Sequence, residues 1–174
     1  IERENNILRE ALNISQNIHP VKEVALISGK DIQGFQDWIL INRGSKHGIA
    51  ENMVVLSPEG ALMGKIFEVE PSFSKVMLII HKDSVVAALI EKSRAEGLIK
   101  RSEKGGLSMD FISNIEKIEI GEKIITSGMD NVYPKGILIG KIENISSTDN
   151  QLFQNITISP IVNFSKLEEV IVIK

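Results

Sequence analysis

The sequence predicts a mainly β protein, in which a short N-terminal coiled-coil helix is followed by two tandem small six-stranded β-barrel domains. Three observations support this fold class. Isoleucine and valine, whose branched side chains favour strands, are abundant along the chain. From Val21 onward the hydrophobic pattern has the period of a strand instead of a helix. The phrase Gly-x-Leu-x-Gly-Lys-Ile occurs twice, at 60–66 and at 136–142, which indicates an internal repeat.

Length and composition exclude several classes of protein. The chain has 174 residues, which allows one large domain or two small ones. Its content of 43% hydrophobic and 25% charged residues is typical of a globular protein with a packed core. The absence of cysteine excludes disulfides, thiolate metal ligands and cysteine nucleophiles. The formal net charge of −3 does not indicate a nucleic-acid-binding surface.

Residues 1–19 have the pattern of an amphipathic helix that ends before Pro20. Two interpretations fit this segment equally well. It is either the end of a coiled coil that pairs two chains, or a single helix packed on its own domain. In the first interpretation the dimer seam consists of the residues with helical spacing, which are Ile7, Leu8, Ala11 and Ile14.

Two sets of six short β-rich runs, separated by turn residues, follow the helix. Runs of this kind without intervening helices favour sandwiches or small barrels. Aligning the two sets on the repeated phrase predicts a first barrel over 20–92 and a second barrel over 93–174. The alignment leaves open whether strands are exchanged between the two barrels.

The repeated phrase has a glycine inside a predicted strand in each copy, Gly64 and Gly140. Glycine weakens a strand, and it marks a bulge or a tight bend at a barrel corner. A barrel of six short strands must bend sharply to close, so one such glycine per copy is expected. Replacing either glycine with valine is predicted to destabilise the barrel that contains it.

No arrangement of residues in the sequence indicates catalysis, a cofactor or a metal. The three histidines, His19, His47 and His81, do not have the spacing of a zinc site. Asp83 and Ser84 follow His81 within one turn, whereas a catalytic triad needs side chains that converge from separate elements. A double-barrel hydrolase with an unconventional site and an OB-like nucleic-acid-binding module remain the alternatives. The second would need a basic groove with stacking aromatics, and aromatic residues make up only 5% of this chain.

The few aromatic residues provide the candidate partner interface, because tryptophan and tyrosine are typical interface anchors. Tyr133 and Pro134 lie in an insertion, GMDNVYPK, that only the second copy of the repeat contains. Phe35 and Trp38 lie in a loop that enters a strand of the first copy. Packing at a barrel end is the alternative role for these residues. The alternative is favoured for Trp38, and an exposed interface is favoured for Tyr133.

Several motifs together resemble a known family. They are Leu8-Arg9-Glu10, Trp38, Asn42-x-Gly44-Ser45-x-x-Gly48-Ile49, Gly60-x-x-x-Gly64, Ser74-x-Val76, Arg94-x-x-Gly97, Gly121-Glu122-x-x-x-Thr126-Ser127-Gly128 and Tyr133-Pro134-x-Gly136-x-x-x-Gly140. This series is similar to that of the MreC family of bacterial rod-shape-determining proteins, and it covers essentially the whole chain. Glu122 and Tyr133 stand where aspartate and phenylalanine are common in the family.

The resemblance implies a non-enzymatic scaffold of the cell-elongation machinery, which synthesises peptidoglycan and controls rod shape. Family members contact the elongation class B penicillin-binding protein and the membrane partners MreD and RodZ. They self-associate as dimers through the coiled coil and as larger assemblies through the barrels. The resemblance also implies an extracytoplasmic position, in the periplasm or on the outer face of the cytoplasmic membrane. The resemblance further implies a membrane-anchoring transmembrane helix that precedes this chain, and the start at Ile1 inside a helical pattern agrees with this expectation.

Overall fold

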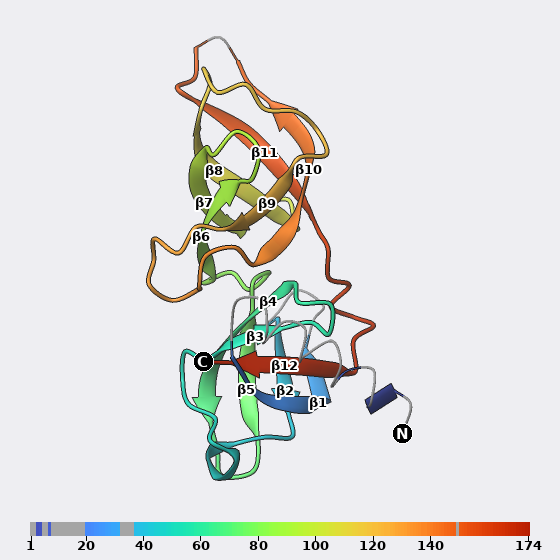
Figure 1. The fold of residues 1–174 in the computed structure, drawn as a ribbon. Helices are drawn as coiled ribbons and strands as arrows, with labels where there is room; N and C mark the ends of the chain where they lie inside the picture. The colour runs from blue at the N-terminus through green and yellow to red at the C-terminus, as the bar shows by residue number, and fades with distance from the viewer. Residues whose placement is uncertain (1–2, 5–6, 8–19, 32–36, 149) are drawn as a thin grey trace. The chain divides into compact units, whose positions relative to one another are not determined.

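Two closed antiparallel barrels of six strands each make up the described part of the chain in a computed structural model (Figure 1). The structure describes residues 3–4, 7, 20–31, 37–148 and 150–174. The chain divides into two compact units, one formed by 1–78 with 163–174 and the other by 79–162. Each unit contains one barrel. The prediction of a mainly β chain with two six-stranded barrels is therefore confirmed.

The first barrel closes in the strand order β1-β12-β3-β4-β5-β2. Its strands are β1 (Val21–Asp31), β2 (Trp38–Ile41), β3 (Val54–Leu56), β4 (Leu62–Val69), β5 (Ser74–Leu78) and β12 (Glu169–Ile173). A single 3-10 turn, η1 (Ser45–His47), follows β2. The inward side chains are almost entirely aliphatic, and they include Ile39, Ile41, Leu62, Ile66, Val76 and Leu78, each at 0% exposure.

The second barrel closes in the order β10-β11-β8-β7-β6-β9. Its strands are β6 (Val85–Ile90), β7 (Glu96–Arg101), β8 (Leu107–Ser113), β9 (Lys123–Thr126), β10 (Leu138–Ser146) and β11 (Phe153–Pro160). Exposed and buried residues alternate along β11, as a strand with one solvent face requires. The barrel core again consists mainly of aliphatic side chains.

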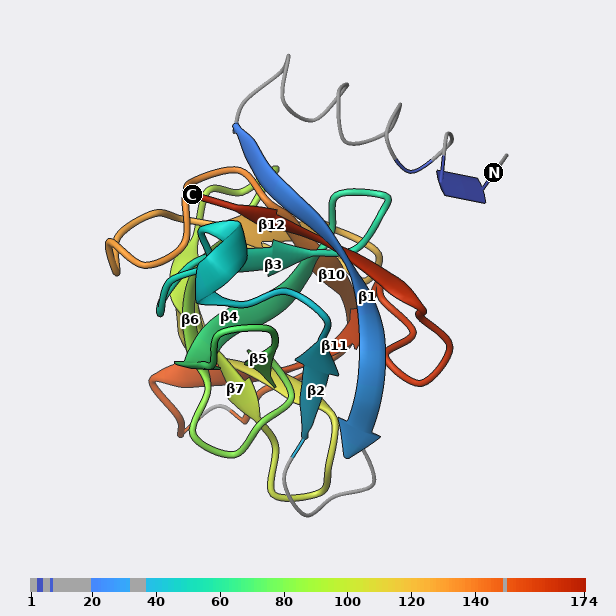
Figure 2. The same cartoon turned by 90° about the horizontal axis from the view of Figure 1, so that it is seen from below.

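The two barrels exchange one strand each. Position by position, the circular orders match β1 with β7, β12 with β6, β3 with β9, β4 with β10, β5 with β11 and β2 with β8. β6 follows the first five strands of the first barrel in the chain, yet it pairs with β7 and β9 in the second. β12 follows the second barrel in the chain, yet it pairs with β1 and β3 in the first, and Figure 2 shows it beside β1.

The predicted domain boundaries of 20–92 and 93–174 are therefore wrong. The boundary lies between Leu78 and Ile79, and the first unit also contains the C-terminal segment 163–174. The physical reason is that β6 and β12 are both short and almost fully buried. Strands with such similar hydrophobic patterns fit the same position in either barrel, so the local sequence does not specify which barrel each one completes.

The two strand glycines lie at equivalent bulges, as the repeat predicts. Gly64 pairs with Val55 on β3, and the register shifts by one residue between Gly64 and Leu62. Gly140 pairs with Ile124 on β9, and the same shift occurs between Gly140 and Leu138. A bulge bends its strand and increases the local twist, as closure of a small barrel requires.

Only three residues of the predicted helix, Arg3, Glu4 and Ile7, are described, and all three have helical conformation. Leu8, Ala11 and Ile14 of the predicted dimer seam lie outside the described residues, as does Phe35. Ile7 is 5% exposed within the single chain, and Arg3 forms ion pairs of 2.8 and 3.1 Å with Glu168 and Glu169. The coiled coil thus stays a prediction. The described residues contain no helix of sufficient length and apolar character to cross a membrane.

Candidate protein-binding surface

Tyr133, a predicted interface anchor, is a core residue. Its side chain is only 3% exposed, and its hydroxyl forms a hydrogen bond with Ser84. Asp130 organises the surrounding loop. Its carboxylate accepts hydrogen bonds from the backbone amides of Val132, Tyr133 and Ala87 at 3.1–3.2 Å. Tyr133 therefore packs inside the second unit and does not present an exposed ring to a partner.

Burial raises the pKa of Tyr133 well above its usual value, and the nearby Asp130 carboxylate adds to the shift. An unfolded tyrosine ionises near pH 10. Above about pH 10 the unfolded chain releases this proton while the folded barrel retains it, so the free energy of unfolding falls as the pH rises.

We expect Tyr133→Phe to reduce this alkaline loss of stability, at the cost of about 1 kcal/mol at neutral pH for the lost hydrogen bond. Urea unfolding of the wild type and the variant at neutral pH and above about pH 10 measures both effects. Because Tyr133 is the only tyrosine, phenolate absorbance reports on it alone. Ionisation of folded wild type near pH 10 would contradict the burial argument.

Pro134 and Trp38, the other predicted interface residues that the structure describes, are partly accessible. Pro134 is half-buried, and its carbonyl accepts a hydrogen bond from the Thr126 hydroxyl. Trp38 is also half-buried, and the Lys75 ammonium lies 5.5 Å from its ring centroid. The structure does not bring Trp38 and Pro134 together in one unit, because Trp38 belongs to the first and Pro134 to the second.

The histidines that the structure describes do not form a catalytic pair. Nδ1 of His81 accepts a hydrogen bond from the backbone amide of Asp83, and Nδ1 of His47 accepts one from that of Gly44. Neither ring has a hydrogen bond to a serine hydroxyl among the described residues. Among the residues that the structure describes, no group of three or more side chains could hold a metal ion. These contacts are those of turn residues.

An exposed apolar cluster on the second barrel is the strongest candidate for a contact surface. Phe111 on β8 and Phe153 on β11 are 55% and 45% exposed, and their rings pack edge to face with centroids 5.6 Å apart. Ile115, in the loop after β8, and Leu152, directly before β11, are 84% and 78% exposed. We call these four residues the aromatic patch. Exposed clusters of large apolar side chains mark interaction sites, and aromatic residues are common binding anchors.

The backbone at Phe111 is strained. Its φ of +69° lies in the left-handed region, which is rare for a bulky residue and costs about 1–3 kcal/mol. The strain comes from a bulge, because Asp110 and Phe111 together oppose Asn155 on β11. The bulge turns the Phe111 ring outward, where it is more than half exposed. Strain that positions an exposed aromatic ring is typical of a functional site.

The loops beside the aromatic patch are held by hydrogen bonds. The side-chain amide of Gln154, which is 6% exposed, donates to the carbonyls of Ser113 and Glu116 at 2.8 and 2.9 Å. The backbone amide of Asn114 donates to the carbonyl of Leu152 at 2.9 Å. The patch is therefore largely pre-organised, which reduces the entropic cost of binding.

Sequence reasoning missed this patch. In the run LSMDFIS, strict alternation from Leu107 and Met109 would turn Phe111 into the core. The bulge instead places Ile112 inside, at 1% exposure, and Phe111 outside. The available signal was the pair of adjacent apolar residues Phe111-Ile112, because two neighbours in a regular strand cannot both face the core.

Comparisons with known proteins identify one family. The family model described as "Rod shape-determining protein MreC, barrel core" matches residues 27–174. The "Cell shape-determining protein MreC" of Bacillus subtilis (strain 168) is 30% identical over 185 residues, which cover 99% of this chain and 64% of that protein. The protein of the same name from Listeria monocytogenes is 29% identical over 180 residues, which cover 100% of this chain and 61% of that protein. The chain thus spans less than two thirds of these relatives.

Solved structures share the fold. A structure named "MreC" superimposes with a TM-score of 0.87 at 20% identity, covering 99% of this chain and 98% of that one. A structure described as a complex between penicillin-binding protein PBP2 and MreC from Helicobacter pylori superimposes with a TM-score of 0.68 at 19% identity. It covers 86% of this chain and 95% of the other.

Proposed function

Because the chain belongs to the MreC family of rod shape-determining proteins, we propose that it is a non-enzymatic scaffold of the cell-elongation machinery. Its role would be to bind the elongation class B penicillin-binding protein and to present it to other components. The Helicobacter pylori relative, whose structure is described as a complex with penicillin-binding protein PBP2, supports this class of partner. The observation that carries the proposal is the aromatic patch with its strained Phe111.

The chemistry of the patch supports a protein partner. Full burial of an aromatic side chain removes about 150–250 Å² from water, and a contact that covers Phe111 and Phe153 would bury the roughly half of each that is still exposed. The flanking Ile115 and Leu152 add to this area. Closed barrels have no free strand edges, so binding by addition of a strand is not available. Side-chain contacts on the outer faces and loops must therefore provide the affinity. The aromatic patch is the part of the second barrel best suited to this role.

The proposal includes further partners and a location. Self-association through the N-terminal helix and through the barrels, contacts with MreD and RodZ, and an extracytoplasmic position anchored by a preceding transmembrane helix all belong to it. In this scheme Ile7, Leu8, Ala11 and Ile14 would form the helix seam. Pairing of two chains would require Ile7, which is buried within the single chain, to exchange one set of contacts for another.

Replacing Phe111 with asparagine tests the proposed surface. We expect binding to the extracytoplasmic part of the elongation class B penicillin-binding protein from the same organism to weaken about tenfold or more, because a central aromatic anchor is lost. Stability should not fall comparably, since asparagine tolerates a left-handed backbone better than phenylalanine. Isothermal titration calorimetry measures the affinity, and thermal unfolding measures the stability.

The matched control is Phe73→Asn, which removes a 40% exposed phenylalanine from the first barrel. It should leave the affinity within about twofold of the wild type. Equal affinities for wild type and Phe111→Asn would place the contact elsewhere on the protein. Failure of the folded wild type to bind this penicillin-binding protein would contradict the choice of partner itself.

A further inference from the structure

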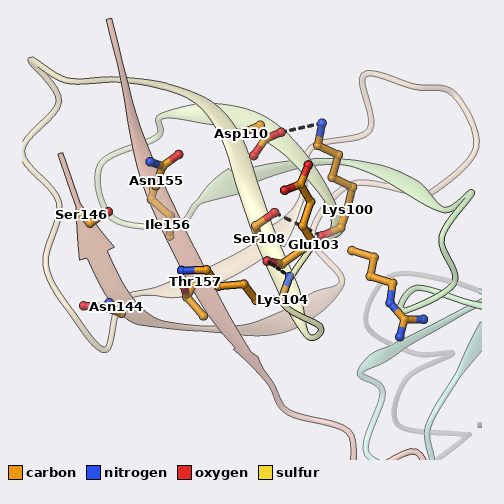
Figure 3. A pocket seen from close by; sticks show the side chains of 12 residues that line it. Lys100, Glu103, Lys104, Ser108, Asp110, Asn144, Ser146, Asn155, Ile156 and Thr157 are labelled. Carbon is orange, nitrogen blue, oxygen red and sulfur yellow. Dashed lines mark hydrogen bonds and ion pairs between the residues drawn. The ribbon is translucent and has the colours of Figure 1, made fainter. Parts of the chain in front are cut away.

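A polar groove lies on the outer face of the second barrel, next to the aromatic patch. It crosses β7, β8, β11 and β10 and has a volume of about 560 Å³, within the range of ligand sites. Figure 3 shows Asn155 and Thr157 along β11, with Asn144 and Ser146 on one side and Ser108 on the other. The strand register places Thr157 opposite both Ser108 and Asn144, and Asn155 opposite Ser146.

The hydrogen-bonding groups of this groove are largely unused. The side chains of Asn144, Ser146, Asn155 and Thr157 are exposed, and none has a hydrogen bond or ion pair to another described residue. Each offers a hydroxyl or an amide, groups that both donate and accept hydrogen bonds. Two rows of such groups on adjacent strands can contact a ligand that is itself dense in donors and acceptors.

The charges of the lining are nearly balanced. It contains three cations, Lys100, Arg101 and Lys104, and two carboxylates, Glu103 and Asp110. The Lys100 ammonium lies 2.7 Å from the Asp110 carboxylate, and Arg101 donates to the carbonyl of Ile80. A groove for phosphates or nucleic acid needs an uncompensated basic surface. The lining therefore suits a largely uncharged polar ligand.

We propose that this groove binds a segment of a polysaccharide chain through hydrogen bonds from Asn144, Asn155 and Thr157 to sugar hydroxyl or acetamido groups. Hydroxyl-rich sugars match the unused donors and acceptors, and small β-barrels such as the OB-fold bind oligosaccharides on a strand face. Phe153 lies on the same face as Asn155, two residues earlier on β11. A sugar chain that extends past Asn155 would meet this ring, which can pack against the apolar face of a sugar.

An extended peptide fits the groove less well. Peptides bind to sheets either by pairing with a free edge or by inserting apolar side chains into pockets. The closed barrel has no free edge, and the lining of the groove is mostly polar. The proposal does not depend on which protein binds the aromatic patch. It can be tested on the isolated chain, without any partner protein.

The test is a titration of the 174-residue chain with chitotetraose and, separately, with cellotetraose, followed by backbone amide NMR shifts. We expect shifts confined to β8, β10 and β11 and a Kd on the order of 1 mM. Binding of chitotetraose alone would indicate recognition of acetamido groups, and binding of both sugars would indicate recognition of hydroxyls. The double variant Asn155→Ala with Thr157→Ala should bind about tenfold more weakly.

The matched control is Asn150→Ala with Ser159→Ala, which removes an exposed amide and an exposed hydroxyl of the same barrel that do not line the groove. The control should bind like the wild type. Absence of shifts with both sugars at concentrations of about 10 mM would overturn the proposal. Shifts that persist unchanged in the Asn155 and Thr157 double variant would overturn it as well.

Discussion

Adding a single methyl group at Gly64 is expected to lower the free energy of unfolding of the first barrel by about 3 kcal/mol or more. A Cβ atom at this position would lie 1.9 Å from the carbonyl oxygen of Met77 and 2.8 Å from its carbonyl carbon. Both atoms belong to the backbone of β5, which is hydrogen-bonded to β4 across the barrel wall. Neither can rotate away as a side chain could, so the two strands must separate.

Chemical unfolding of Gly64→Ala, with the circular dichroism of the barrels as the signal, measures this effect. Gly140→Ala should destabilise the second barrel in the same way, because its Cβ would lie 2.3 Å from the carbonyl oxygen of Ser159. The control is Gly29→Ala on β1, where the new atom would lie 3.4 Å from Cβ of Leu40, an ordinary contact. If Gly64→Ala and Gly29→Ala have the same free energy of unfolding, the close approach of β4 and β5 is not the reason that position 64 needs glycine.

Placing a charge in β12 is expected to unfold the first barrel, although β12 follows the second barrel in the chain. Ile171 is 0% exposed and pairs with Val24 on β1 and with Leu56 on β3. An unpaired carboxylate at this position costs several kcal/mol, a large part of the stability of a small domain. Ile171→Asp should therefore remove the tertiary structure of the first barrel and leave that of the second.

The reciprocal variant is Val86→Asp in β6, which should unfold the second barrel instead. Backbone amide NMR spectra distinguish the two outcomes, because signals of residues 79–162 persist in one variant and are lost in the other. Loss of signals from 93–162 in Ile171→Asp, with residues 37–78 unaffected, would instead support the tandem arrangement of barrels. In that arrangement the last strand belongs to the second domain.

The repeat shows how much of this fold the sequence alone could predict. Two strand glycines in equivalent phrases correctly predicted equivalent bulges, because close backbone approach is a local requirement that only glycine satisfies. The number of strands per barrel was also predictable, since turn residues separate them. The exchange of β6 and β12 was not predictable, because pairing partners depend on contacts between residues far apart in the chain.

The candidate surface was harder to predict for a similar reason. Tyr133 was interpreted as an exposed anchor because it lies in an insertion, but the Asp130 carboxylate folds that insertion back and buries the ring. Strict alternation along β8 would place Phe111 in the core, but one bulge turns its side chain to the solvent. Exposure thus depends on single-residue irregularities that hydrophobic periodicity does not detect.

The exchanged strands also determine the order in which the protein can be completed during its synthesis. Every strand of the second barrel lies between residues 79 and 162, so this barrel can close while the C-terminal residues are still being added. The first barrel must wait for β12, whose Glu169 pairs with Leu26 near the opposite end of the chain. Contacts between residues so distant in sequence form slowly. Until β12 emerges, β1 and β3 each lack a neighbour, and the nascent chain exposes two open strand edges to its surroundings.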